Sequence, residues 1–313
     1  MSLPIVVLGS LNADLVVTCT ELPQRGQTVF GNGFHRFPGG KGANQAVAAA
    51  RLGGAVRHIG AVGDDETGAW LVAQLRANGV DVEGIAVTAA APTGTALITV
   101  DHAGQNTIVV VPGANAQCSP AQAERELGGT RAAGEAAGIL LLQLEVPLET
   151  VEAAARAARR SGHTVILNPA PVAALPETLL ASCDCVIPNE TEAAALTGLP
   201  VDTIDQAITA AQALRTGRDG RVIVTLGSRG SVYAGPEGAF HQPPWPVEAV
   251  DATAAGDCFV AAFAVALANG TPLREALAFA SAAGALTATK LGAQASLPTA
   301  AEVRGFMQGR VRP

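Results

Sequence analysis

The chain has 313 residues, of which 49% are hydrophobic and 15% are charged, and its formal net charge is −7. This composition is typical of a folded protein with a large buried core and excludes a disordered chain. The acidic balance, with no basic stripe along the sequence, argues against a nucleic-acid partner.

The sequence also predicts no membrane partner and a cytoplasmic location. No apolar run reaches the roughly 18 uncharged residues that a membrane-spanning helix needs. The chain enters a strand-like run, Ile5-Val6-Val7-Leu8, without a basic leader before it. Cys183 and Cys185 lack the spacing of a zinc site, so the five cysteines are expected to be reduced thiols.

Strand-like apolar runs alternate with helical patterns along the chain. Strands are predicted at residues 5–8, 56–62, 139–144, 164–167, 185–187 and 222–226, and helices at 42–52, 67–78, 148–161 and 204–215. This alternation predicts an α/β fold in which a central, mostly parallel sheet carries helices on both faces. A last apolar stretch, residues 273–291, is expected to form one or two packed helices.

Two segments break this rhythm. Residues 15–37 and 95–111 have the pattern of antiparallel strands with turns, and residues 101–104 suit a hairpin tip. Segments of this size cannot form a core of their own. The chain, residues 1–313, is therefore interpreted as a single α/β domain with a small β-sheet lid formed by approximately residues 15–38 and 95–111.

Asn12 and Asp14 follow the first predicted strand, and Glu145 follows a buried-looking strand. Loops at the carboxyl ends of strands are where open α/β sheets bind ligands. An amide and carboxylates can form hydrogen bonds with the neighbouring hydroxyls of a polyol. The alternatives are an Asx-turn for the first pair and an ordinary surface loop for Glu145.

A glycine turn, Gly39-Gly40-Lys41-Gly42-Ala43-Asn44-Gln45, precedes an alanine-rich helical run. It has neither the spacing of a Walker A loop nor that of a Rossmann motif. Lys41 and Asn44 add polar side chains at the start of the helix. Taken alone, the motif is also compatible with a simple turn.

Two further motifs suit a nucleotide. Asn189 and Glu192 open a helix, where the plain interpretation is an N-cap and its capping-box partner. The segment Thr225-Leu226-Gly227-Ser228-Arg229-Gly230 follows an apolar strand, and its glycines permit close approach of a ligand. A strand–turn–strand connection is the alternative for this segment.

The segment Asp251-Ala252-Thr253-Ala254-Ala255-Gly256-Asp257 precedes an uncharged run of helix formers, residues 258–268. Its small residues allow a turn whose N–H groups converge at a helix N-terminus, which is an anion-binding arrangement. Asp257 is then placed to accept a proton from a hydroxyl that attacks a bound phosphate. The alternative is that Asp257 only caps the helix.

These motifs, together with residues 7–14, 143–149, 167–171 and 292–296, resemble the ribokinase family of small-molecule kinases, the pfkB carbohydrate kinases. The resemblance covers nearly the whole chain. It implies ATP-dependent phosphorylation of D-ribose at the 5-hydroxyl, with Mg²⁺ and K⁺ as cofactors and a homodimer formed through the lid. The alternatives are a related kinase for deoxyribose, another sugar or a nucleoside, and a non-catalytic sugar-binding protein.

The resemblance also implies roles for individual residues. Catalysis is expected from Asp257 as the base, with the N–H groups of Ala254, Ala255 and Gly256 around the phosphoryl group. The sugar would contact Asn12, Asp14, Gly40, Lys41, Gly42, Asn44, Glu145 and Asp257. ATP would contact Asn189, Glu192, Thr225, Leu226, Gly227, Ser228, Arg229, Gly230, Gly256 and Ser281. A monovalent cation would be held by Asp251, Thr253, Thr287, Lys290, Gly292 and Ser296.

The chain departs from the family pattern on the nucleotide side. Ala252 stands where a threonine is common, and Ser281 stands where a histidine often lies near the adenine. Lys290 and Leu291 replace a more basic pair. The positions expected to face the sugar are intact.

Overall fold

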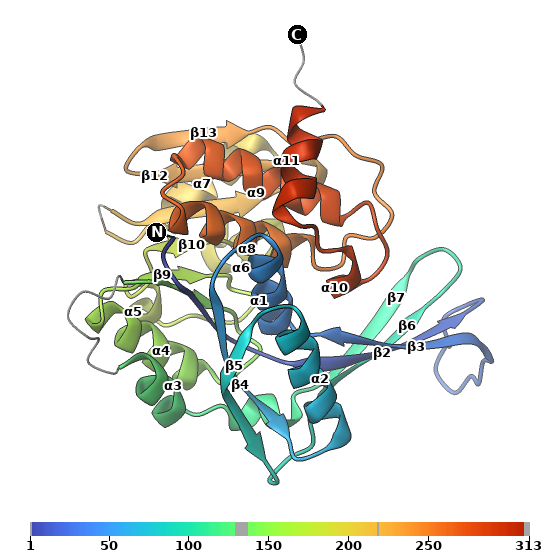
Figure 1. Cartoon of the computed structure of the whole chain (residues 1–313). Coiled ribbons are helices and arrows are strands. Elements are labelled where there is room, and N and C mark those ends of the chain that lie inside the picture. The colour runs from blue at the N-terminus through green and yellow to red at the C-terminus, as the bar shows by residue number, and fades with distance from the viewer. Residues whose placement is uncertain (1, 129–136, 218, 310–313) are drawn as a thin grey trace.

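A computed structural model of the chain describes residues 2–128, 137–217 and 219–309, which contain two β-sheets. A nine-stranded sheet has the order β13-β12-β11-β10-β9-β8-β1-β4-β5, and a four-stranded sheet has the order β3-β2-β6-β7 (Figure 1). Neighbours in the large sheet are parallel except for β11 with β12 and β12 with β13. The predicted fold class is confirmed.

The large sheet contains β1 (Ile5–Leu8), β4 (Val56–Gly63), β5 (Asp81–Thr88), β8 (Ile139–Leu142), β9 (Thr164–Leu167), β10 (Cys185–Val186), β11 (Arg221–Thr225), β12 (Ser231–Gly235) and β13 (Gly238–Gln242). Strands occur at all six predicted places, whereas β5, β12 and β13 were not predicted. β5 and β13 are edge strands with exposed residues, so they lack the continuous apolar run of a buried parallel strand.

The helices are α1 (Lys41–Arg51), α2 (Glu66–Ala77), α3 (Pro120–Leu127), α4 (Leu148–Arg160), α5 (Glu177–Leu180), α6 (Glu190–Thr197), α7 (Ile204–Ala213), α8 (Ala255–Ala268), α9 (Leu273–Thr287), α10 (Ala293–Ser296) and α11 (Ala300–Gln308). Two short 3₁₀ helices are η1 (Gly113–Gln117) and η2 (Gly227–Arg229). No helix in the described ranges is both long and apolar enough to cross a membrane.

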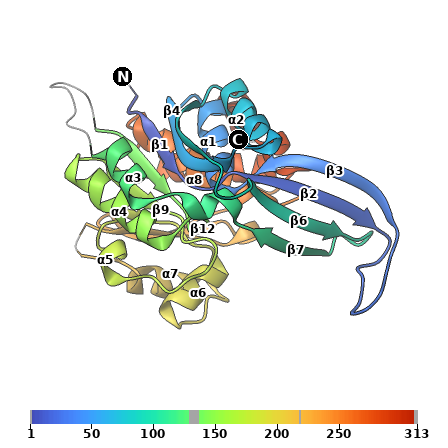
Figure 2. The same ribbon diagram turned by 90° about the horizontal axis from the view of Figure 1, so that it is seen from below.

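The core lies in two layers, one on each face of the large sheet. Successive side chains of a strand point to opposite faces, so Ile139 and Leu141 of β8 join one layer and Leu140 and Leu142 join the other. The first layer is completed by α1, α2, α8, α9 and α11, and the second by α3 to α7. Figure 2 shows the sheet between these two groups of helices.

The small sheet consists of β2 (Asn12–Cys19), β3 (Gly31–Gly39), β6 (Gly94–Val100) and β7 (Asn106–Val111). Its central pair, β2 and β6, is parallel, and both outer pairs are antiparallel. The sheet projects from the side of the main body (Figures 1 and 2). Its strands fall close to the two ranges predicted to form a lid, and the lid function itself stays a prediction.

Candidate active site

Helix α1 begins where a glycine turn folds against the loop after β1. Gly40 has φ 89°, a left-handed value that favours glycine, and a Cβ there would lie 2.9 Å from Ser10 O. The turn directs the N–H of Lys41 to Glu145 Oε2 at 3.0 Å, and Ser10 Oγ donates to the same oxygen at 2.5 Å. Glu145 is therefore fixed by the start of α1 and by the β1 loop.

The start of α8 is strained. Ala254 is its N-cap residue and has φ 61°, the only positive φ among the non-glycine residues of the described ranges. A left-handed alanine costs roughly 1–2 kcal/mol. Ala254 and Gly256 line the cavity beside this turn, whereas the N–H of Ala255 donates to Ala252 O at 3.1 Å. The strained turn therefore lies at the wall of a cavity.

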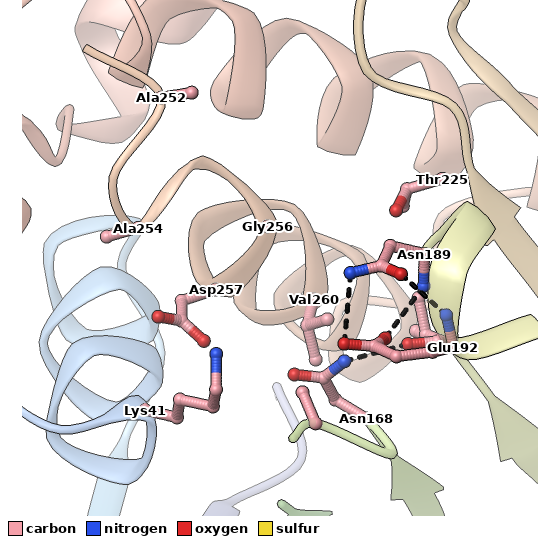
Figure 3. Close-up of a pocket in the computed structure, with 12 residues that line it drawn as sticks. Lys41, Asn168, Asn189, Glu192, Thr225, Ala252, Ala254, Gly256, Asp257 and Val260 are labelled. Carbon is pink, nitrogen blue, oxygen red and sulfur yellow. Dashed lines mark hydrogen bonds between the residues drawn. The ribbon is translucent and has the colours of Figure 1, made fainter. Parts of the chain in front are cut away.

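Asp257 does not cap its own helix, so the capping alternative is wrong. Its carboxylate is buried and reaches across to α1, where Asn44 Nδ2 donates to Oδ2 and Gln45 Nε2 donates to Oδ1, each at 3.1 Å. Figure 3 shows the Lys41 ammonium group pointing toward this carboxylate. Burial raises the pKa of Asp257, while the charge of Lys41 and the two amide hydrogen bonds oppose that rise.

Lys41 and four carboxylates form one group of charges that influence one another. Burial, followed by the charges of Glu145 and Asp257, raises the pKa of Asp14 to about 7. The charge of Asp257 is the main cause that raises the pKa of Lys41, and Glu145 and Glu192 add to it against the effect of burial. Residues from β2, α1, α8 and the loop after β8 are thus within electrostatic reach of one another, although they are far apart in sequence.

Asn12 is held by Asn115, a residue with no distinguishing pattern in the sequence. Asn115 in η1 donates Nδ2 to Asn12 Oδ1 at 2.7 Å, and its own Oδ1 accepts the N–H of Leu11 at 2.9 Å. Asn12 Oδ1 therefore has a partner within the protein, which leaves its Nδ2 as the group available to donate to a ligand.

Two cavities adjoin at the N-terminus of α8. The smaller, of about 220 Å³, and the larger, of about 420 Å³, share Thr225, Ala252 and Gly256 as lining residues. Lys41, Asp257, Asn189 and Glu192 line the smaller one (Figure 3). The predicted acceptor side and the predicted nucleotide side therefore meet at Asp257 and Gly256.

Asn189 and Glu192 form the predicted capping box. Asn189 Oδ1 accepts the N–H of Glu192 at 2.8 Å, and Glu192 Oε2 accepts the N–H of Asn189 at 2.8 Å. Burial raises the pKa of Glu192, while the Asn189 N–H and then the charge of Lys41 oppose it. Glu192 therefore lines the smaller cavity and also completes the capping box of α6.

Only some residues of the segment 225–230 line the larger cavity. Residues Thr225, Gly227, Ser228 and Gly230 line the larger cavity. Leu226 is buried, and the Arg229 guanidinium is held by Glu190 at 2.7 Å. Ser281 of α9 lines the same cavity.

Sequence reasoning missed an apolar part of the larger cavity, formed by Pro244, Trp245, Pro246, Val247 and Phe259. The indole N–H of Trp245 donates to Ala278 O at 3.0 Å, which fixes the ring. The dense run Pro243-Pro244-Trp245-Pro246 was the available signal, because it cannot continue a helix or a central strand.

Asp251 joins two loops. Its Oδ1 accepts the N–H and the hydroxyl of Thr253 at 2.9 and 2.6 Å, and its Oδ2 accepts the N–H of Gly292 at 2.9 Å. Burial raises the pKa of Asp251, but these hydrogen bonds lower it by a larger amount, so its pKa lies below the usual value. Asp251 is therefore bonded to the backbone of both loops, and its role toward a cation stays a prediction.

The other predicted cation-site residues have partners of their own. The buried hydroxyls of Thr287 and Ser296 donate to carbonyls of Ala283 and Ala293 at 2.9 and 2.8 Å. The Lys290 ammonium pairs with Glu302 at 3.2 Å. Carbonyl oxygens are therefore the groups that these positions could offer to a cation.

The sequence profile of the pfkB family carbohydrate kinases matches residues 3–300. The chain is 41% identical over 303 residues to the ribokinase of Bacillus subtilis, covering 97% of this chain and 99% of that one. It is 34% identical over 304 residues to the deoxyribokinase of Salmonella typhi, covering 97% and 98%.

Solved structures agree with these relatives. A Thermotoga maritima ribokinase superposes with a TM-score of 0.85 at 37% identity, covering 98% of this chain and 99% of that one. An Arabidopsis thaliana ribokinase complexed with ribose and ATP gives 0.86 at 35%, again covering 98% and 99%. An E. coli protein in complex with ATP and Mg²⁺ gives 0.80 at 25%, covering 99% and 100%. The chain belongs to the pfkB family of carbohydrate kinases.

Proposed function

We propose that the protein transfers the γ-phosphoryl group of ATP to the 5-hydroxyl of D-ribose. The observation that carries this proposal is the position of Asp257, a buried carboxylate between the polar groups of α1 and the N-terminus of α8. Relatives named ribokinase, one of them solved with ribose and ATP, favour ribose over the alternatives.

A hydroxylated sugar suits the groups around Lys41. Asp14 and Glu145 offer carboxylate oxygens that accept from sugar hydroxyls, whereas Asn12 and Lys41 offer N–H groups that donate to them. Asn44 lies between the sugar side and Asp257, because its Nδ2 is bonded to Asp257 while its buried Oδ1 has no hydrogen-bond partner in the described structure. We expect Asn44 Oδ1 to accept from a sugar hydroxyl.

In the proposed step, Asp257 accepts the proton of the 5-hydroxyl as that oxygen attacks the γ-phosphorus. The new P–O bond forms as the bond to the β-phosphate oxygen breaks, and ADP leaves. The N–H groups of Ala254 and Gly256, at the positive end of the α8 dipole, would stabilise the charge on the transferring group. The N–H of Ala255 could join them only by leaving Ala252 O.

The larger cavity suits the adenosine part of ATP, because its lining combines glycines with the apolar residues around Trp245. We expect Gly227, Ser228, Gly230 and Ser281 to contact it. Mg²⁺ would lie near the Glu192 carboxylate, whose charge fits a hydrated ion, and would neutralise the phosphates of bound ATP.

The proposal as a whole is tested by measuring ADP release over a panel of sugars and nucleosides. D-ribose should give the highest kcat/KM, with ribose 5-phosphate as the product. A higher kcat/KM for a nucleoside or for deoxyribose would select one of the alternative substrates. Ribose binding without any ADP release would favour the non-catalytic alternative.

Asp257→Asn should keep the fold and the affinity for both ligands while kcat falls by about 10²–10⁴-fold, the usual size of general-base loss. The new amide can be accommodated, since Asn44 can turn its unpartnered Oδ1 toward it. Steady-state kinetics, ribose titration and melting temperature measure the three quantities. The control is Asp184→Asn, whose carboxylate accepts the N–H of Val165 near the amino ends of β9 and β10. A kcat within a few-fold of the parent would show that Asp257 is not the base.

Ribose should be preferred over 2-deoxyribose by roughly tenfold or more in kcat/KM, because losing a bonded hydroxyl leaves buried polar groups unpaired. Asp14→Ala should bring this ratio close to one. Equal kcat/KM for the two sugars in the parent would contradict the ribose assignment.

The pKa of Asp14 is about 7, so the carboxylate is protonated below that pH and ionised above it. Ribose should therefore bind more tightly at pH 8 than at pH 6, and Asp14→Asn should weaken this pH dependence.

We also propose that K⁺ binds between the loops that Asp251 joins, among carbonyls of Thr253, Thr287, Lys290 and Gly292 and near Ser296. Carbonyl and carboxylate oxygens suit a weakly hydrated cation, whose charge would support the adjacent anion-binding turn. Activity and melting temperature should both be lower in tetramethylammonium chloride than in KCl. Asp251→Ala should remove both differences. Equal values in the two salts for the parent would overturn the site.

The exposed face of the small sheet is proposed to join two copies of the chain. Strand register places Phe34, Leu97 and Val109 on the face opposite to Asp14, and all three are exposed. Sedimentation velocity should show a dimer, and Leu97→Asp with Val109→Asp should give a monomer. Val87→Asp, at an exposed valine of β5, is the matched control. A monomeric parent would contradict this proposal.

A further inference from the structure

Gln45 contacts the proposed base without belonging to either ligand site. Its side chain is 0% exposed, and it is not among the residues that line the two cavities. With no exposed surface, its side chain is not available to either ligand. Nevertheless, its Nε2 donates to Asp257 Oδ1 at 3.1 Å, on the carboxylate oxygen that Asn44 does not contact.

The direction of the Gln45 amide is fixed from two sides. Its Oε1 accepts from Gln143 Nε2 at 2.5 Å, and its Nε2 also donates to Asn168 Oδ1 at 3.1 Å. Asn168 is itself fixed, because its Nδ2 donates to Ile187 O at 2.9 Å. A reversed Gln45 amide would bring its oxygen against two acceptor oxygens and its NH₂ group against a donor.

This chain of hydrogen bonds is built into the sheet. Gln143, Asn168 and Ile187 each follow the end of a strand, respectively β8, β9 and β10, which are neighbours. Gly9, after β1, leaves room for the group, because a Cβ there would lie 2.1 Å from Gln143 Oε1. Three parallel strands therefore deliver donors and acceptors of defined polarity to one side chain of α1.

We propose that Gln45 is a positioning residue that holds the Asp257 carboxylate in the orientation required for proton transfer, and that Gln143 and Asn168 fix the direction of its amide. This inference rests on the proposed function, in which Asp257 is the base. The Gln45 hydrogen bond also favours the ionised carboxylate, because it is among the contacts that lower the pKa of Asp257 against the effect of burial.

The substitution that tests this is Gln45→Met, which keeps the length of the side chain and removes both the donor and the acceptor. A hydrogen bond to a buried charged group contributes enough that its loss should move the apparent pKa on the acid side of the kcat/KM profile upward by about one to two units. At neutral pH kcat should fall roughly tenfold or more, with partial recovery at higher pH, while the KM for ATP stays unchanged.

The matched control is Gln122→Met. Gln122 is also buried, and its Nε2 donates to the carbonyls of Gly60 and Gly84 at 2.8 and 2.9 Å, remote from Asp257 in the second core layer. This variant should lose stability without moving the pH profile. A purely structural role for Gln45 predicts the same behaviour for both variants, so an unmoved profile in folded Gln45→Met would overturn the proposal.

Gln143→Met provides a second test that does not alter Gln45 itself. It removes the donor that fixes the Gln45 amide, so it should shift the profile in the same direction by a smaller amount. If Gln45→Met does not fold, an unmoved profile in Gln143→Met would overturn the proposal.

The outcome for Asp257→Asn distinguishes a failure of the proposed function from a failure of the role proposed for Gln45. If that variant stays active, the proposed function fails. If it is inactive while Gln45→Met and Gln143→Met keep the parent profile, only the role of Gln45 fails.

Discussion

A buried carboxylate between two helices is the constraint on which the rest of this site depends. The charge of Asp257 loses its hydration when α8 packs against α1, and the protein must replace water with fixed donors. It does so with the amides of Asn44 and Gln45, the ammonium of Lys41 and the N-terminal dipole of α8. The close approach of α1 and α8 is therefore both a packing requirement and an electrostatic one.

The parallel sheet makes this replacement possible. Its strands end at a common edge, so loops distant in sequence deliver one polar group each to the same small volume. Glu145 lies 104 residues from Lys41, and Gln45 lies 123 residues from Asn168. The glycine turn at Gly40 determines where α1 begins relative to these loops. If α1 began at another residue, Lys41 and Asn44 would not lie beside the groups that these loops provide.

The fold and the proposed site residues were largely predictable, because each left a local signal. Buried parallel strands such as β8 are apolar throughout, a glycine turn marks the start of α1, and a run of small residues marks the start of α8. The residues that form hydrogen bonds with the side chains of the site have no comparable pattern in the sequence. Gln143 and Asn115 are ordinary polar residues until the fold places them beside Gln45 and Asn12. The sequence is compatible with Asp257 as a helix cap, and only the structure excludes that role, because Ala254 is the N-cap residue of α8.

The site also works against the stability of the protein that carries it. Ala254 holds a left-handed conformation, and the raised pKa values of Asp14 and Asp257 mean that burial of their charges is incompletely compensated. Each of these costs is reduced by a ligand with the chemistry proposed above: sugar hydroxyls donate to the carboxylates, and an anion satisfies the N–H groups that the strained turn exposes. Under the proposed function, the features that destabilise the unliganded protein would become differential binding energy for ribose and ATP, because a ligand lacking a hydroxyl or a phosphate would leave the corresponding cost uncompensated.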